Sequence, residues 1–268
     1  MISLLAFIRI GLEELKTRKG LLIFLIAVII YYTWILFFRV EITWEAGEII
    51  NTSGGAFLSG GEEMYLNGYT QLYLLLLIAS IALSVIVTHS YFSSEISHLL
   101  LTRPVNRIEI FVFAILSTTL IIWTLFAVLH VYFLTLYVVR DGVFVAGLLY
   151  TLLPLLGTVL AIVAVSQFFV LVSDSVFASF SYSLVLFLVI PLLLLVNQNY
   201  QMVESRFLLE SFDRIHSLIP DPTSGLENVT DSLFQPPSDS LVASLPRIGL
   251  FSVVWMGIGY FVFRRKSY

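Results

Sequence analysis

The sequence predicts an all-helical integral membrane protein with an N-terminal interfacial amphipathic helix, six transmembrane helices and two large outer segments. Of its 268 residues, 59% are hydrophobic and only 12% are charged, whereas a soluble domain carries about a quarter charged residues. The apolar runs are continuous and lack the alternation that a membrane β-barrel requires. The chain contains no cysteine, which excludes a disulfide framework and thiolate metal sites.

Six apolar runs are long enough to cross a bilayer, which takes roughly 20 residues in a helix. The third and fourth runs exceed this length, so these two helices must tilt or project from the bilayer. The sixth run has the weakest signal, because Pro246 and Arg247 stand near its start. The predicted spans are residues 20–38, 70–88, 108–139, 143–172, 176–196 and 245–263.

The basic residues orient these spans. With six spans and a cytoplasmic N-terminus, nine of the 14 lysines and arginines fall on the cytoplasmic side, although the outer segments are longer. This asymmetry agrees with the positive-inside rule. We therefore expect a multi-pass protein of the plasma membrane with both termini in the cytoplasm. The cytoplasmic group is Arg9, Lys16, Arg18, Lys19, Arg103, Arg107, Arg264, Arg265 and Lys266.

Residues 1–19 contain the predicted interfacial helix. Its apolar residues recur at helical spacing and its charged residues fall on another side, as in helices that lie on a membrane surface. A signal peptide would place its charges before the apolar core, but here the basic cluster KTRK follows the apolar residues. The apolar set is Leu4, Leu5, Ile8, Leu12 and Leu15, and the charged set is Arg9, Glu13 and Lys16.

Residues 89–108 form a polar break between the second and third spans, on the cytoplasmic side. Glu95 suits the first turn of a short helix, and Ile96, Leu99 and Leu100 share one face of it by their spacing. Pro104 cannot continue that helix. Two interpretations fit this pattern: a compact element with an apolar ridge and a basic end, or a loop that lies against the membrane and carries topogenic arginines.

The two outer segments are the loop at 39–69, whose glycines suggest turns between short pieces, and the acidic, proline-containing stretch at 197–244. No repeat is visible, and no part of the chain is suited to a separate soluble domain. The whole chain, residues 1–268, is therefore predicted to be one transmembrane domain.

Residues 95–110 resemble the loop after the second span in type-2 ABC transporter permeases. The specific part is the stretch LLTRPVNRIEI at 100–110, preceded by Glu95, although Ser97 and His98 stand where the family often has a Gly-Thr step. The N-terminal helix, the six spans and the short basic tail RRKSY extend this resemblance over nearly the whole chain. By resemblance, the short helix docks on a separate ATPase subunit, through Glu95, Ile96, Leu99, Leu100, Arg103, Pro104 and Arg107.

The resemblance implies partners. The chain contains no Gly-x-x-x-x-Gly-Lys-Ser/Thr phosphate loop, so ATP would bind to two copies of an ATPase subunit, and this chain would be no enzyme and hold no cofactor. Six spans are half of the usual twelve, so a second permease copy is implied, first as a homodimer and second as a related heterodimer. Export is the default direction in the family, and no nucleic-acid partner is expected.

Three other interpretations have some support in the sequence. A secondary carrier would need ionisable groups within the spans, where His130 is the main example, and a lone histidine is more often a packing residue. A CAAX-type protease is suggested by Glu13, Glu14 and Arg18 in the pattern Glu-Glu-x-x-x-Arg, and by Phe126 with His130, but these short patterns arise easily by chance. One permease branch serves copper-enzyme maturation, yet the chain has no cysteine and only four methionines, so no metal site is expected.

Overall fold

The computed structural model describes residues 4–17, 29, 41–45, 48–52, 61–92, 106–141, 152–190 and 239–265. The chain divides into two compact units, one of residues 1–14 with 76–268 and the other of residues 15–75. The described residues of the first unit are entirely helical apart from short connections, whereas the second unit contains a β-hairpin and the beginning of a long helix.

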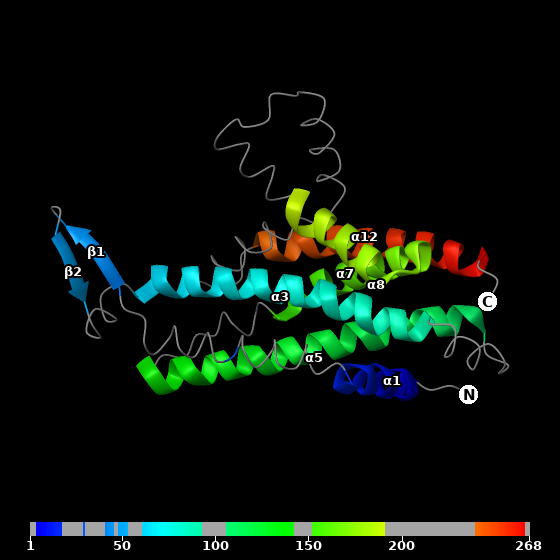
Figure 1. Ribbon diagram of the computed structural model, residues 1–268, viewed down its shortest axis with the longest axis horizontal. Helices are drawn as coiled ribbons and strands as arrows, with labels where there is room; N and C mark the ends of the chain where they lie inside the picture. The colour runs from blue at the N-terminus through cyan, green and yellow to red at the C-terminus, as the bar shows by residue number, and fades with distance from the viewer. Residues whose placement is uncertain are drawn as a thin grey trace, which may run out of the picture. The chain divides into compact units, whose positions relative to one another are not determined.

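The first unit is a bundle of long apolar helices (Figure 1). Two helices belong to this unit in part: α1 (Leu4–Thr17) with its residues up to 14, and α3 (Gly61–Phe92) with its residues from 76 onward. The other elements belong to it entirely: α5 (Arg107–Asp141), α7 (Leu152–Ser173), α8 (Val176–Leu184), the π-helix η2 (Val185–Val189) and α12 (Asp239–Arg265). A helix satisfies its own backbone hydrogen bonds, which is why uninterrupted apolar sequence of this length takes the helical form in lipid.

Four of the described helices are long and apolar enough to cross a membrane: Leu75–Phe92, Arg107–Tyr132, Leu155–Ser173 and Ile248–Arg265. They correspond to the predicted second, third, fourth and sixth spans. The predicted first span lies outside the described residues except for residue 29, and the fifth is described up to residue 190, as the shorter apolar helix Val176–Val189. The protein is thus helical with several apolar helices of membrane-spanning length.

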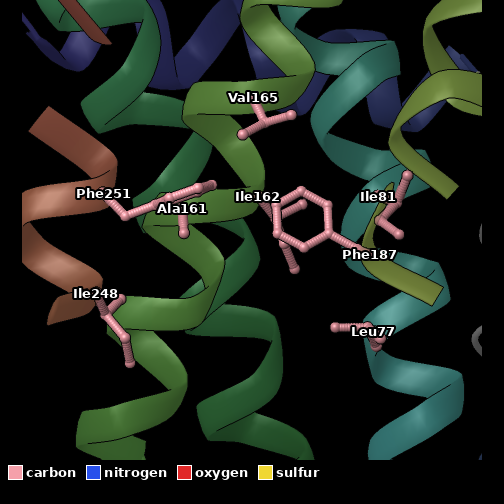
Figure 2. Packing of buried hydrophobic residues seen from close by; sticks show 8 residues of the cluster. All are labelled: Leu77, Ile81, Ala161, Ile162, Val165, Phe187, Ile248 and Phe251. Atoms are coloured by element: carbon pink, nitrogen blue, oxygen red, sulfur yellow. The ribbon is translucent and has the colours of Figure 1, made fainter. Parts of the chain in front are cut away.

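The centre of the bundle lies between α3, α7, η2 and α12. Figure 2 shows Ala161 of α7 beside Phe251 of α12, and Ile162 beside the ring of Phe187 from η2, with Ile248 of α12 in the same cluster. Leu77 and Ile81 of α3 complete the cluster together with Val165. The span in α12 is only 22% buried, compared with 72% for that in α3, so α12 lies at the edge of the bundle and α3 lies inside it.

Contacts between the helices establish their directions. Phe92 at the end of α3 packs on Phe263 near the end of α12, and Arg107 at the start of α5 contacts the carbonyl of Arg264. Helix α7 runs in the same direction as α12, because Gly157 faces Ile248 and the later Phe168 packs on Trp255. The ends of α3, α7 and α12 and the start of α5 therefore share one end of the bundle, called the basic end here.

Helix α1 runs along the bundle. The ring of Phe7 contacts those of Tyr91 and Phe113, and one turn later Gly11 faces Val87 and Ile121. These partners lie progressively farther from the basic end on both α3 and α5, so α1 packs along both helices. Its position relative to a membrane surface stays a prediction.

The surface through which α1 packs differs from its predicted apolar face. Phe7 and Gly11 are the buried residues of α1, whereas two of the predicted leucines, Leu5 and Leu12, are 74% and 51% exposed. Arg9 and Glu13 form an exposed ion pair at 3.0 Å, of a kind that contributes about 0–1 kcal/mol. Lys16 is exposed in the last turn.

The second unit contains the antiparallel strands β1 (Glu41–Glu45) and β2 (Glu48–Thr52), which pair from Glu41 opposite Thr52 to Glu45 opposite Glu48. The strands are separated by two residues, the commonest length of a hairpin connection. This hairpin departs from the expectation of a purely helical chain, and it occupies part of the predicted first outer loop.

Candidate functional site

The predicted coupling segment is described at its two flanks. Residues 93–105 lie outside the described residues, and with them the predicted interface residues Glu95, Ile96, Leu99, Leu100, Arg103 and Pro104. The structure describes the end of α3 at Phe92 and the chain from Asn106 onward. Of the seven predicted interface residues, Arg107 is the one whose contacts are visible.

Asn106 defines where α5 begins. Its side-chain Oδ1 accepts a hydrogen bond from the backbone N–H of Ile108 at 3.2 Å, and its carbonyl accepts from Glu109 at 2.9 Å and Ile110 at 3.2 Å. An asparagine in this position satisfies N–H groups that the helix itself cannot pair. An asparagine directly before a long apolar run is the usual sequence signal of such a helix start.

An aromatic cluster joins the two flanks of the segment to α12. The ring of Phe263 lies 5.3 Å from Phe92 and 5.8 Å from Phe111, and Phe111 also packs edge-on against Tyr260 at 5.6 Å. Such ring pairs contribute about 0.5–1.5 kcal/mol each beyond the area they bury. Arg107 adds a hydrogen bond from Nη1 to the carbonyl of Arg264 at 3.2 Å. The end of α3, the start of α5 and the end of α12 are therefore held together.

Tyr91 makes a second junction, between α1, α3 and α5. Its side chain is fully buried, its hydroxyl donates to the carbonyl of Phe7 at 2.8 Å, and the hydroxyl of Ser117 donates to it at 3.1 Å. The phenol oxygen is thus satisfied both as donor and as acceptor. The helices on both sides of residues 93–105 are therefore packed against their neighbours, α3 on α1 and α12, and α5 on α12.

The turn between α7 and α8 lies at the same end of the bundle. Asp174 has a left-handed backbone (φ 53°), and Ser175 caps α8 by accepting from the N–H of Ala178 at 3.4 Å. The hydroxyls of Ser173 and Ser179 share a hydrogen bond of 2.8 Å across the turn. Two apolar side chains beside it are exposed, Val172 at 56% and Phe177 at 79%.

The side chain of His130 contacts the backbone of its own helix, α5. The side chain is fully buried, and its Nδ1 lies 2.8 Å from the carbonyl of Phe126. The two residues of the Phe-x-x-x-His pattern are therefore joined by a hydrogen bond along one turn of α5. Among the residues that the structure describes, no group of three or more His, Cys, Asp or Glu side chains could hold a metal ion.

Comparison with protein-family models, with curated proteins and with solved structures finds no match for this chain.

Proposed function

We propose that this chain is the membrane-spanning permease subunit of an ATP-binding-cassette transporter of type 2, driven by a separate ATPase subunit. The chain supplies the helices of the translocation path, and ATP hydrolysis takes place on two copies of the partner. A second copy of the permease completes the path, first as a homodimer in the plasma membrane. Export is the proposed direction.

The observation that carries this proposal is that the helices on either side of residues 93–105 are held together by α12. A coupling element can transmit force only if both of its ends are attached to rigid helices. The preceding helix ends at Phe92 and the following helix begins after Asn106, and the aromatic cluster around Phe263 packs on both. The sequence of the segment supplies the apolar ridge and the basic flank that a docking partner would contact.

Further support comes from the basic end itself. Arg107, Arg264 and Arg265 stand there, which is the charge pattern of a cytoplasmic face. The turn between α7 and α8 lies at this end with Phe177 exposed. A soluble partner on this face would meet both connections.

The test replaces the predicted ridge. Changing Leu99 and Leu100 together to aspartate should abolish co-purification of the ATPase while the permease still inserts and stays monodisperse. Truncation of one apolar anchor of a docking surface costs about 2 kcal/mol of binding free energy or more. The loss of two anchors therefore weakens binding by about 4 kcal/mol, close to a thousandfold in Kd. The measurement is the ATPase recovered per permease after purification in mild detergent.

The matched control is His98→Asp, which introduces the same carboxylate on the opposite side of the short helix by its spacing. This variant should retain the ATPase. If the Leu99→Asp, Leu100→Asp double variant retains as much ATPase as the His98→Asp variant, residues 93–105 are not the coupling element.

A further inference from the structure

The interior of the bundle contains polar side chains of two kinds. Many buried hydroxyls bond to the carbonyl one turn back, as serine and threonine commonly do in helices: Ser80 donates to Leu76, Thr118 to Ala114 and Ser252 to Ile248, at 2.7–2.8 Å. Ser84, Thr88 and Thr119 do not, and within the described part of the chain their oxygens have no hydrogen-bond partner.

Gln167 of α7 is the most demanding of these groups. The residue is 1% exposed, and neither its amide nitrogen nor its amide oxygen has a partner in the part of the chain that the structure describes. An amide offers two N–H donors and an oxygen with two lone pairs. Buried polar groups in folded proteins nearly always bond to protein or to ordered water, so this amide requires a partner.

Two of the four residues lie at one depth in the bundle. Phe92 of α3 and Phe263 of α12 are in contact. Thr88 lies one turn before Phe92, and Gly259 lies one turn before Phe263, so Thr88 and Gly259 are at the same depth. Gly259 in turn faces Phe168, the neighbour of Gln167. Thr88 and Gln167 are therefore level, about 6–9 Å from the helix ends at Phe92 and Ser173.

The other two lie at a second, deeper level. Ser84 precedes Phe92 by eight residues and Thr119 follows Phe111 by eight residues, in helices of opposite direction, and both phenylalanines pack on Phe263. Ser84 and Thr119 are thus each about 12 Å from the aromatic cluster. The four residues therefore lie at two depths in the bundle, and Thr88 and Gln167 are nearer to the basic end than Ser84 and Thr119.

We propose that water from the basic end enters the interior between α3, α5 and α7 and binds to Gln167, Thr88, Ser84 and Thr119. All four side chains are neutral and can both donate and accept hydrogen bonds, as the partners of a water molecule do. Buried water typically makes about three hydrogen bonds to groups of this kind. The site is independent of the proposed coupling function, because its test involves no ATPase.

The test uses hydrogen–deuterium exchange of a single thiol. The chain has no cysteine, so one introduced cysteine gives the only S–H stretching band in the infrared spectrum of the protein. Ser84→Cys and Gln167→Cys place this probe at the two levels. Ser84→Cys is nearly isosteric and keeps the experiment meaningful if the Gln167 variant does not fold, as checked by size-exclusion chromatography.

The controls are Val87→Cys and Val170→Cys, which are 0% and 2% exposed and lie nearer to the basic end on the same two helices. After transfer into deuterated buffer, the thiols at 84 and 167 should exchange at least about tenfold faster than these controls, which must first open locally. Exchange that is equal at all four positions, or that is faster at the two shallower valines, overturns the proposal.

Discussion

Replacing Gly11 by alanine tests the packing of α1 on the bundle. A β-carbon at this position would lie 2.5 Å from the hydroxyl oxygen of Tyr91, 2.7 Å from Cδ1 of Ile121 and 3.1 Å from Cγ1 of Val87. The end of the Ile121 side chain can rotate away. The Tyr91 hydroxyl cannot move without loss, because it is bonded to Phe7 and Ser117.

The expected cost follows from these contacts. Overpacking of a well-packed site costs about 1–3 kcal/mol, and loss of one hydrogen bond of Tyr91 adds about 1 kcal/mol. Alanine regains about 1 kcal/mol through its higher helix propensity. The Gly11→Ala substitution should therefore lower the free energy of unfolding by about 2 kcal/mol, measured by denaturation in mixed detergent micelles.

Two comparisons make this prediction specific. Gly257→Ala in α12 adds the same methyl group where nothing beyond the local helix backbone lies within 4 Å, and it should raise the free energy of unfolding by up to about 1 kcal/mol through the higher helix propensity of alanine. In a Tyr91→Phe background, which removes the clashing oxygen, Gly11→Ala should cost less by about 1 kcal/mol. The reasoning is refuted if Gly11→Ala is as stable as Gly257→Ala, or if its cost is the same in both backgrounds.

Two further predictions concern the membrane topology and the turn between α7 and α8. In the cysteine-free chain, Gly55→Cys and Thr230→Cys should react with an impermeant thiol reagent from outside the cell and Ser94→Cys should not, and outside labelling at Ser94→Cys would overturn the six-span arrangement. Residue 174 has a left-handed backbone (φ 53°), a conformation that costs a β-branched residue about 1–2 kcal/mol, so Asp174→Val should lower the free energy of unfolding by this amount. Asp174→Asn should keep the free energy of unfolding within about 0.5 kcal/mol of that of the unchanged protein, because asparagine tolerates this conformation. Equal unfolding free energies of these two variants would contradict this account of the turn.

The long helices could be predicted from the sequence because apolar length is a property of the chain itself. The run predicted at 108–139 corresponds to α5 at Arg107–Asp141, and the one ending at residue 172 corresponds to α7, which ends at Ser173. Helix α12 was predicted from residue 245 and begins earlier, at Asp239, with Pro246 inside it. Composition near a proline does not show whether the helix continues through it.

The packing face of α1 could not be predicted in this way. Glycine is among the least favourable helix residues, so hydrophobic periodicity does not indicate that Gly11 faces the bundle. This becomes visible only when Tyr91 and Ile121 are known to lie against it. The hairpin at Glu41–Thr52 does have a sequence signal, since Ile42 and Trp44 alternate with polar residues at the period of a strand. The unpartnered Gln167 is visible only when burial and partners are known together.

The central claim is that this protein is driven by a separate ATPase, and the most direct measurement is purification of the tagged protein from mild detergent with mass spectrometry of what accompanies it. We expect a soluble ATPase in a stoichiometric amount, two copies with two copies of this chain. An oligomer of this chain without any such partner would contradict the account and would favour a carrier or a membrane enzyme, for which His130 would be the first residue to change.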